Sequence, residues 1–236
     1  MPKVMIVYWQ IRNQTFEYSG MDSLDHCVDK KHFKKYNKPV SYNFNSWGCR
    51  DQEPPHELDD VIWCVGDSFT VGLGQPAEET WPKILEKKLN KRCLNVGQDG
   101  CPNDMMSIRV KEIKEKYDPK VIIIMWSYFA RRLVDGNFLF HEIKTTAEDD
   151  LNNFLKNFIK ANEPYKNCKI LNYIIPNAFI DENGKPVDST QLTNEINKNT
   201  KEISFKIVEQ LDYSRDGHHF DISTCEKIVK DILTKY

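Results

Sequence analysis

Val61-Ile62-Trp63-Cys64-Val65-Gly66-Asp67-Ser68 begins the regular part of this sequence, because five apolar residues lead directly into a turn that carries glycine, aspartate and serine. An apolar run of this length that ends at a glycine turn is typical of a buried strand. Over residues 82–90 the spacing becomes helical, with Ile84, Leu85 and Leu89 on one face. The stretch therefore predicts a strand, a turn and a helix, in that order.

The same alternation continues towards the C-terminus. Strands are expected over residues 93–96, 121–126 and 169–175, and helices around residues 105–113 and over residues 147–162. The run over residues 121–126 lacks the alternation of a half-exposed strand, which predicts a central strand covered on both faces. Together these elements predict an α/β fold, a three-layer α/β/α sandwich with a mainly parallel sheet of about five strands.

The last quarter of the chain allows two interpretations. Residues 194–210 are expected to form either one helix, or a helix followed by a short fifth strand near residues 208–211. A terminal helix is expected from about Ser223.

The first 58 residues differ from the rest. They contain short aromatic pieces, over residues 4–9 and 40–44, separated by polar turns and by Pro54-Pro55. We expect an irregular N-terminal extension over residues 1–58, with a first strand at residues 4–9, packed on a main domain over residues 59–236.

The composition limits the class of ligand and the cellular compartment that we expect for this protein. The net charge of -2 indicates neither a nucleic-acid partner nor an anionic membrane surface, so a small molecule is favoured. The apolar start is too short for a secretion signal or a membrane span, and the seven irregularly spaced cysteines are typical of reduced, mostly buried thiols. We therefore expect a cytoplasmic protein without membrane insertion, and the sequence holds no metal-ligand pattern and no cofactor motif.

Ser68 lies where a nucleophile could act. In an open α/β sheet, ligands bind beyond the carboxyl ends of the strands, and the turn that carries Ser68 directly follows a predicted strand. A glycine loop over residues 95–100 follows the next strand and could supply a backbone N–H to a developing oxyanion.

Asp216-Gly217-His218-His219 precedes the last helix and could supply the base. Serine needs a base to remove its proton, and that base needs a partner that fixes its orientation. Each motif alone has a structural explanation, since glycine and serine are frequent in any strand-to-helix turn and an aspartate is a common helix cap. Their joint order at one predicted edge of the sheet favours chemistry.

The order of these motifs resembles the SGNH or GDSL-like hydrolases, esterases and lipases with a flavodoxin-like fold. Gly66-Asp67-Ser68 looks like the nucleophile block of that family, and Asp216 to His219 looks like its acid-base block. The resemblance implies a triad of Ser68, His219 and Asp216, with oxyanion N–H groups from Ser68 and Gly100. Residues 45–51 are also similar to an N-terminal hairpin of some members, so the likeness covers roughly residues 45–236.

The third family block is different here. Family members carry a Gly-x-Asn-Asp sequence after the third strand, whereas this chain has Trp126-Ser127-Tyr128 followed by Phe-Ala-Arg131. The amide that would donate to the oxyanion is missing, and the loss of one such donor costs about a hundred- to a thousand-fold in rate. Ser127 Oγ or the Tyr128 hydroxyl could replace it. Close packing explains Ser127 equally well.

The same segment suggests a substrate. Trp126, Tyr128 and Arg131 are expected beside the pocket, where aromatic faces and a guanidinium would suit a sugar ring or an acidic group. An aromatic run is also typical of a core. The sequence thus predicts hydrolysis of a small acyl ester, of acetyl type, on a carbohydrate or similar small molecule. The alternatives are a catalytically impaired binding module on the same scaffold and an acyltransferase that uses the same serine.

Overall fold

The computed structural model describes residues 11–36, 38–134, 137–139, 145–200 and 203–236. The strand expected at residues 4–9 lies outside these residues. No helix in the described part of the chain is long and apolar enough to cross a membrane.

Five parallel strands form the central sheet, in the spatial order β4-β3-β5-β8-β9. Their bounds are Ile62–Gly66 for β3, Cys93–Asn95 for β4, Val121–Trp126 for β5, Lys169–Ile174 for β8 and Phe205–Ile207 for β9. Counted along the chain, this is the 2-1-3-4-5 order of flavodoxin-like folds. The predicted parallel sheet of about five strands is therefore confirmed, and β5 is its central strand.

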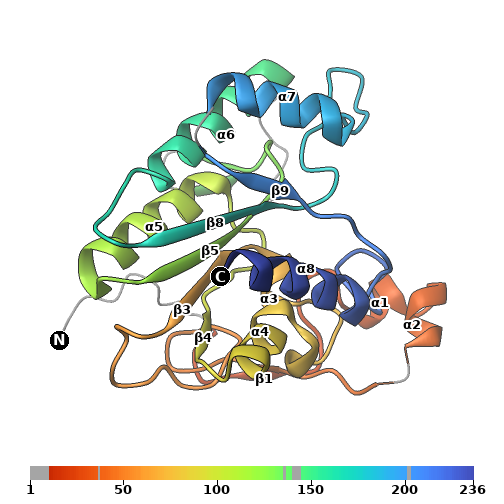
Figure 1. Ribbon diagram of the computed structural model, residues 1–236. Coiled ribbons are helices and arrows are strands. Elements are labelled where there is room, and N and C mark those ends of the chain that lie inside the picture. Colours follow the sequence, from red (N-terminus) through yellow and green to blue (C-terminus); the bar gives the residue numbers. More distant parts are fainter. Residues whose placement is uncertain (1–10, 37, 135–136, 140–144, 201–202) are drawn as a thin grey trace.

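Helices cover both faces of this sheet (Figure 1). The helices are α3 (Ser68–Val71), α4 (Trp81–Leu89), α5 (Asn103–Tyr117), α6 (Ala147–Ala161), α7 (Ser189–Asn199) and α8 (Ile222–Lys235), with a short 3-10 turn at Ala77–Glu79. Helices α5 and α6 pack together on one face, and α4 and α8 pack together on the other. The three layers expected from the sequence are thus present.

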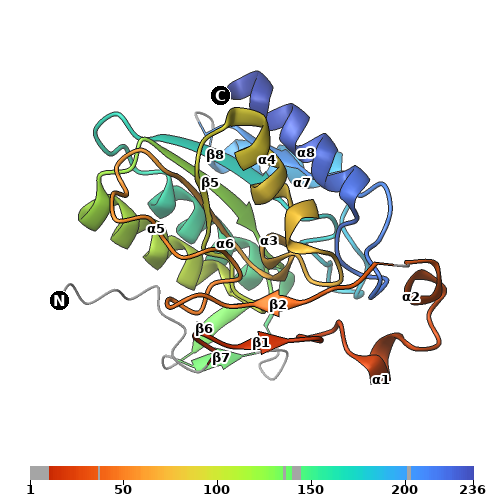
Figure 2. The same cartoon turned by 90° about the horizontal axis from the view of Figure 1, so that it is seen from below.

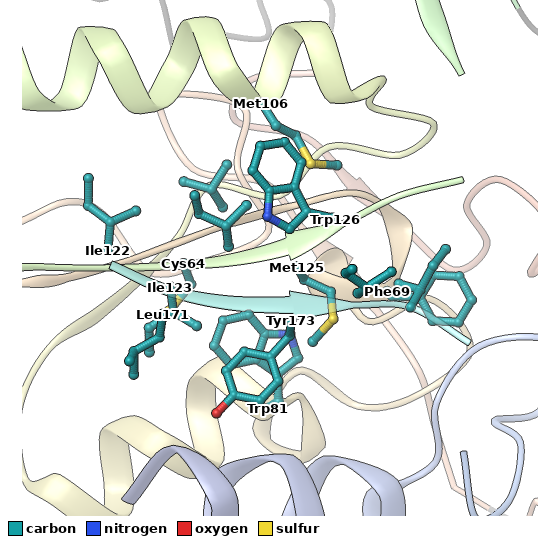
Figure 3. Close-up of a cluster of buried hydrophobic side chains, with 14 of the residues drawn as sticks. Cys64, Phe69, Trp81, Met106, Ile122, Ile123, Met125, Trp126, Leu171 and Tyr173 are labelled. Atoms are coloured by element: carbon teal, nitrogen blue, oxygen red, sulfur yellow. The ribbon is translucent and has the colours of Figure 1, made fainter. Parts of the chain in front are cut away.

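The side chains of β5 alternate between the two faces of the sheet. Figure 3 shows Trp126 directed towards Met106 of α5, whereas Met125 lies on the opposite face with Trp81 and Tyr173. All five side chains are buried, so the strand contributes to the core on both sides. Burial of side chains of this size stabilises a fold by roughly 2–3 kcal/mol each.

The region after β8 differs from the sequence prediction. Helix α7 begins at Ser189 because the Asp188 carboxylate accepts hydrogen bonds from the backbone N–H groups of Thr190 and Gln191. The helix ends at Asn199, and the fifth strand occupies Phe205–Ile207 rather than residues 208–211. The single long helix over residues 194–210 was therefore wrong, and the alternative of a helix and a strand was correct apart from its position.

The N-terminal extension is built from short elements. They are β1 (Thr15–Phe16), α1 (Leu24–Cys27), α2 (Lys31–Lys35) and β2 (Tyr42–Asn43), with β1 and β2 paired antiparallel. A second antiparallel pair, β6 (Arg132–Val134) and β7 (Asn137–Leu139), follows β5. The extension lies beside α3 (Figure 2), and its residues Val40, Tyr42 and Phe44 form a small apolar cluster with Val71 of α3 and with Leu73.

All seven cysteines are free thiols, and six of them are buried; only Cys168 is partly exposed. Burial raises the pKa of the Cys49 and Cys225 thiols to about 12, so these thiols stay protonated and unreactive in the folded protein.

Candidate active site

Ser68 is the first residue of α3 and directly follows the turn at the end of β3. Asp67 caps this helix, since its Oδ1 accepts a hydrogen bond of 3.0 Å from Phe69 N. Gly66 must be glycine here, because a Cβ at that position would lie 2.1 Å from Thr70 Oγ1. The tight turn fixes the Ser68 hydroxyl at the carboxyl edge of the sheet.

His219 lies in the loop between β9 and α8, on the same edge of the sheet. Its Nε2 is 2.8 Å from Ser68 Oγ, and its Nδ1 is 2.6 Å from Asp216 Oδ2. All three side chains are almost completely buried. The structure therefore brings together the three residues expected to form the triad, in the order serine, histidine, aspartate.

Asp216 is held in its ionised form. Burial alone would raise the pKa of this carboxyl, but the hydrogen bond and charge of His219 and two backbone N–H groups hold it well below its usual range. Its Oδ1 accepts from the N–H groups of His218 and His219 and from Ser214 Oγ, at 2.9–3.0 Å. An ionised carboxylate in this position can stabilise a protonated imidazole.

The loop that carries Gly100 is fastened to α3. Asn95 Nδ2 donates to Thr70 O at 2.7 Å, while Asn95 Oδ1 accepts from Gly97 N at 3.0 Å. Gly97 itself allows a close approach, since a Cβ there would lie 2.9 Å from Val71 N. Gly100 has a φ of +67°, which favours glycine.

Asp99, which the sequence analysis did not single out, lies next to Gly100. Its side chain reaches solvent, yet the surrounding protein takes away part of its hydration, and this raises the pKa of the carboxyl. The charge of Asp67 adds to the rise, while His219 and a hydrogen bond from Gly100 N–H oppose it.

Ser127 does not have the role expected of it as an oxyanion donor. Its Oγ donates to Asp67 Oδ2 at 2.5 Å and accepts from Arg131 at 2.9 Å, and its N–H donates to Asn103 Oδ1. The side chain is completely buried. Because both donors are used within the protein, Ser127 orders Asp67 instead of facing a ligand.

Trp126 is a core residue, so the expectation that it contacts substrate was wrong. It is completely buried, and its ring packs against Phe154 and Phe158 of α6. Figure 3 shows it directed towards α5. Its Nε1 donates to Asn172 Oδ1 at 3.0 Å. The last residue of β5 points into the helical layer, and alternation along a strand decides this direction.

Tyr128 and Arg131 do lie beside the triad. Arg131 forms an ion pair of 2.8 Å with Asp67 Oδ2 and places its guanidinium 4.8 Å from the centre of the Tyr128 ring. Tyr128 Oη lies 3.2 Å from His218 Nε2. Burial and the charge of His219 lower the pKa of His218 to about 4, and burial and the charge of Asp67 raise the pKa of Tyr128 to about 12. Both groups are therefore neutral near pH 7.

A cavity of about 660 Å³ opens at the carboxyl ends of β8 and β9. Its lining includes Asn177, Asp188, Gln210 and the exposed ring of Tyr213. Gln210 Nε2 donates to the carbonyl oxygens of His218 and His219 at 3.0 and 3.1 Å, which connects the cavity wall to the loop of the base. The volume is in the range of small-molecule sites.

Comparison with known proteins gives a likeness in structure alone. No family model and no curated protein sequence matches the chain. Among solved structures, a family two carbohydrate esterase from Clostridium thermocellum in complex with cellohexaose is similar at a TM-score of 0.53 and 15% identity. The match covers 78% of this chain and 65% of that one, so this chain spans slightly less than two thirds of its length.

A second solved structure is described as a carbohydrate esterase whose active site displays divergent catalytic and non-catalytic binding functions. It is similar at a TM-score of 0.50 and 15% identity, over 85% of this chain and 68% of that one. At this identity the comparison shows a shared fold.

Proposed function

We propose, from the SGNH-hydrolase fold that this chain has, that the protein hydrolyses a carboxylic ester with Ser68 as its nucleophile. The observation that carries the proposal is the pair of contacts from Ser68 Oγ to His219 Nε2 and from His219 Nδ1 to Asp216 Oδ2. These distances lie within or at the edge of the range for proton transfer between a nucleophile, its base and an orienting carboxylate.

In the proposed reaction, His219 removes the proton of Ser68 as Oγ attacks the ester carbonyl carbon. Asp216 remains ionised and stabilises the imidazolium that forms. The negative oxygen of the tetrahedral intermediate accepts hydrogen bonds from the N–H groups of Ser68 and Gly100. The intermediate then expels the alcohol, which takes its proton from His219. Water, deprotonated by His219, attacks the acyl-enzyme and releases the acid and the free serine.

The carboxylate of Asp99 lies close to the Gly100 N–H that this step uses, and its side chain reaches solvent. The Tyr128 hydroxyl lies 3.2 Å from His218 Nε2, and in the tautomer in which this nitrogen accepts, the hydroxyl has no proton left to donate to an oxyanion. We therefore expect an oxyanion hole of two backbone donors and a correspondingly modest rate.

A small acyl ester of a carbohydrate is the proposed substrate class. The cavity beyond β8 and β9 is lined by amides, carboxylates, the exposed Tyr213 ring and apolar side chains such as Leu192, and no residue of the proposed triad lines it. Its lining within the described residues includes no lysine or arginine. Such a surface suits a neutral alcohol rich in hydroxyl groups. The likeness to a carbohydrate esterase that binds cellohexaose points in the same direction. Turnover of simple lipid esters without turnover of acetylated sugars would contradict this substrate class.

A binding module is the second candidate function. The loss of the third-block amide and the engagement of both Ser127 donors favour it, since they leave fewer groups to stabilise a transition state. Acyl transfer to an acceptor hydroxyl is a third possibility, which product analysis with an added sugar acceptor distinguishes from hydrolysis.

The deciding experiment measures hydrolysis of p-nitrophenyl acetate and butyrate by the wild type, Ser68→Ala and His219→Ala. We expect each variant to lose at least about 1000-fold in kcat. Ser204→Ala, which changes an exposed serine immediately before β9, is the matched control and keeps its activity. Labelling of Ser68 by an organophosphonate is the second measurement. A wild type that neither turns over nor labels excludes the esterase and favours the binding module.

A further inference from the structure

The N-terminal extension contacts both loops that carry the proposed triad. We call residues 72–76, which follow α3, the nucleophile loop, and residues 212–220, which contain Asp216 and His219, the acid-base loop. Asp22, at the end of a turn closed by a bridge with Ser19, is completely buried between them.

Asp22 binds the acid-base loop through Arg215. Its Oδ1 accepts from Arg215 Nε at 2.7 Å, and its Oδ2 accepts from Arg215 Nη2 at 2.8 Å. This two-pronged pair fixes the direction of the guanidinium as well as its distance. Arg215 directly precedes Asp216, so the pair restrains the backbone next to the carboxylate of the triad.

Asp22 binds the nucleophile loop through Tyr42. The Tyr42 hydroxyl donates to Asp22 Oδ2 at 2.5 Å and accepts from Gly74 N at 2.8 Å. Arg215 N in turn donates to Gly74 O at 3.1 Å. The four residues Asp22, Arg215, Gly74 and Tyr42 thus form a closed circuit of hydrogen bonds.

The two loops touch at the point that this circuit holds. A Cβ on Gly74 would lie 2.3 Å from Ser214 Oγ and 3.1 Å from Asp216 Cγ, so no space separates them. Ser214 Oγ donates to Asp216 Oδ1 at 2.9 Å. A shift of Gly74 relative to Arg215 is therefore passed directly to the carboxylate that orients His219.

Lys30 forms a further connection between the extension and the acid-base loop. Its Nζ donates to Asp216 O at 2.9 Å. Replacing a buried ion pair with apolar groups often leaves stability unchanged, so the pair of Asp22 and Arg215 is poorly explained as a source of stability. Its geometry instead fixes the separation of two loops whose relative position sets the contact between Ser68 and His219. A misplacement of about 1 Å in such a site can cost about a hundred-fold in rate.

We infer that Asp22 is a positioning residue for the triad, which acts through Arg215 and Tyr42 and makes the N-terminal extension part of the active site. This inference rests on the proposed esterase function. It predicts that loss of the Asp22 carboxylate lowers the reactivity of Ser68 although Asp22 touches none of the reacting atoms.

The test compares Asp22→Asn with Asp25→Asn, which removes an exposed carboxylate three residues away in the same extension. We expect Asp22→Asn to lower kcat for p-nitrophenyl acetate about 10- to 100-fold with KM changed less than about threefold. Labelling of Ser68 by the phosphonate slows by the same factor, and Asp25→Asn remains at the wild-type rate. A merely structural role would lower the amount of folded enzyme but leave the kcat of the folded fraction, counted by phosphonate titration, unchanged.

A double-mutant cycle tests the route of the effect. If Asp22 acts through Arg215, the double variant Asp22→Asn with Arg215→Gln is no slower than the slower single variant. Additive losses, or a folded Asp22→Asn with wild-type kcat, overturn the inference. If Asp22→Asn does not fold, Tyr42→Phe breaks the same circuit by removing one oxygen atom, and the same outcomes apply. A wild type without turnover and labelling overturns the proposed function and this inference together, whereas an active wild type beside an unaffected variant overturns the inference alone.

Discussion

Gly74 is a residue at which the structure leaves no room for a side chain. It has a φ of +76°, and a Cβ there would meet Ser214 and Asp216. Gly184 has nearly the same φ of +74°, but no described atom lies within 4 Å of a Cβ built on it. The two glycines therefore separate the cost of backbone strain from the cost of a steric clash.

We predict that Gly184→Ala lowers the free energy of unfolding by about 1–2 kcal/mol, the usual cost of a left-handed alanine. Gly74→Ala should cost clearly more, and should also lower kcat about 100-fold or more, because the clash displaces Asp216. Urea unfolding and p-nitrophenyl acetate turnover measure the two effects. Equal effects of the two substitutions would show that the loops can separate without harm.

His218 makes the protein sensitive to acid. The pKa of His218 is lowered to about 4 in the folded protein, below the value of about 6.5 for an unfolded chain. As pH falls from 6.5 to 4, the unfolded chain takes up a proton that the folded chain refuses. Stability is therefore lost over this window.

We predict that His218→Asn retains about 1–2 kcal/mol more of its stability than the wild type between pH 7 and pH 4.5, after allowance for its partial exposure. Urea unfolding at several pH values measures this difference. His56→Asn, which changes an exposed histidine, is the control and should follow the wild type. Parallel curves for all three proteins would contradict the prediction.

The residues of the site differed in how far the sequence could predict them. Ser68, Asp216 and His219 occur in contiguous motifs at element boundaries, and boundaries fix which end of the sheet a side chain reaches. Trp126 and Ser127 are adjacent residues at the end of β5, where the face to which a side chain points depends on the register of the strand. Register follows from pairing with neighbouring strands, which a sequence pattern does not specify.

Among the elements, the sequence predicts the central strands better than the last strand. Strand β5 has six consecutive buried residues and neighbours on both sides, so its apolar run was an adequate signal. Strand β9 reads Phe205-Lys206-Ile207 and pairs only with β8 in the sheet order, so few of its residues need to be apolar. The position of β9 depends on where α7 ends. No glycine or proline follows Asn199 directly, so the sequence carries no helix-stop signal there.

Helix α8 depends on a cap that lies two residues after the base of the proposed triad. The Asp221 carboxylate accepts from the N–H groups of Ser223 and Thr224 at 3.1 and 3.0 Å. We predict that Asp221→Ala lowers the free energy of unfolding by about 1–2 kcal/mol, as for other lost caps. Thermal or urea unfolding measures the loss.

The cap of α6 offers a comparison for this prediction. Thr146 Oγ1 accepts from the backbone N–H of Asp149 at 3.1 Å, and α6 packs with α5 on the face of the sheet opposite α8. Thr146→Ala should therefore cost stability without lowering turnover by the folded enzyme, whereas Asp221→Ala should lower both. A reduction of kcat by Thr146→Ala alone would contradict this assignment.

In the molecule as a whole, most of the N-terminal extension packs outside the main apolar core. Val40, Tyr42 and Phe44 of the extension form a small cluster with Val71 and Leu73, while the main core surrounds the whole sheet. Segments with little buried apolar surface open at lower free energy than the global unfolding reaction. No sequence pattern predicts the contacts that hold the extension against the acid-base loop, because Asp22 and Arg215 are 193 positions apart.

We predict that backbone amides of β2 exchange with deuterium at least about 100-fold faster than those of β5, because the extension opens without the sheet. Hydrogen exchange read by mass spectrometry measures both segments in one sample. Asp22→Asn should accelerate exchange in β2 and leave β5 unchanged. Equal protection of the two strands in the wild type would show that the extension and the sandwich unfold as one unit.

The cysteines lie in different regions of the protein, so their alkylation reports when each region opens. Cys27 is buried in the extension, Cys64 and Cys93 are buried in the sheet, and Cys168 is partly exposed. A buried thiol reacts with an alkylating reagent only while the structure around it is open. The alkylation rate of each cysteine therefore measures how often its own region opens. The order in which Cys168, Cys27 and the sheet cysteines become alkylated would reveal the sequence of opening events in the native protein, without any introduced label.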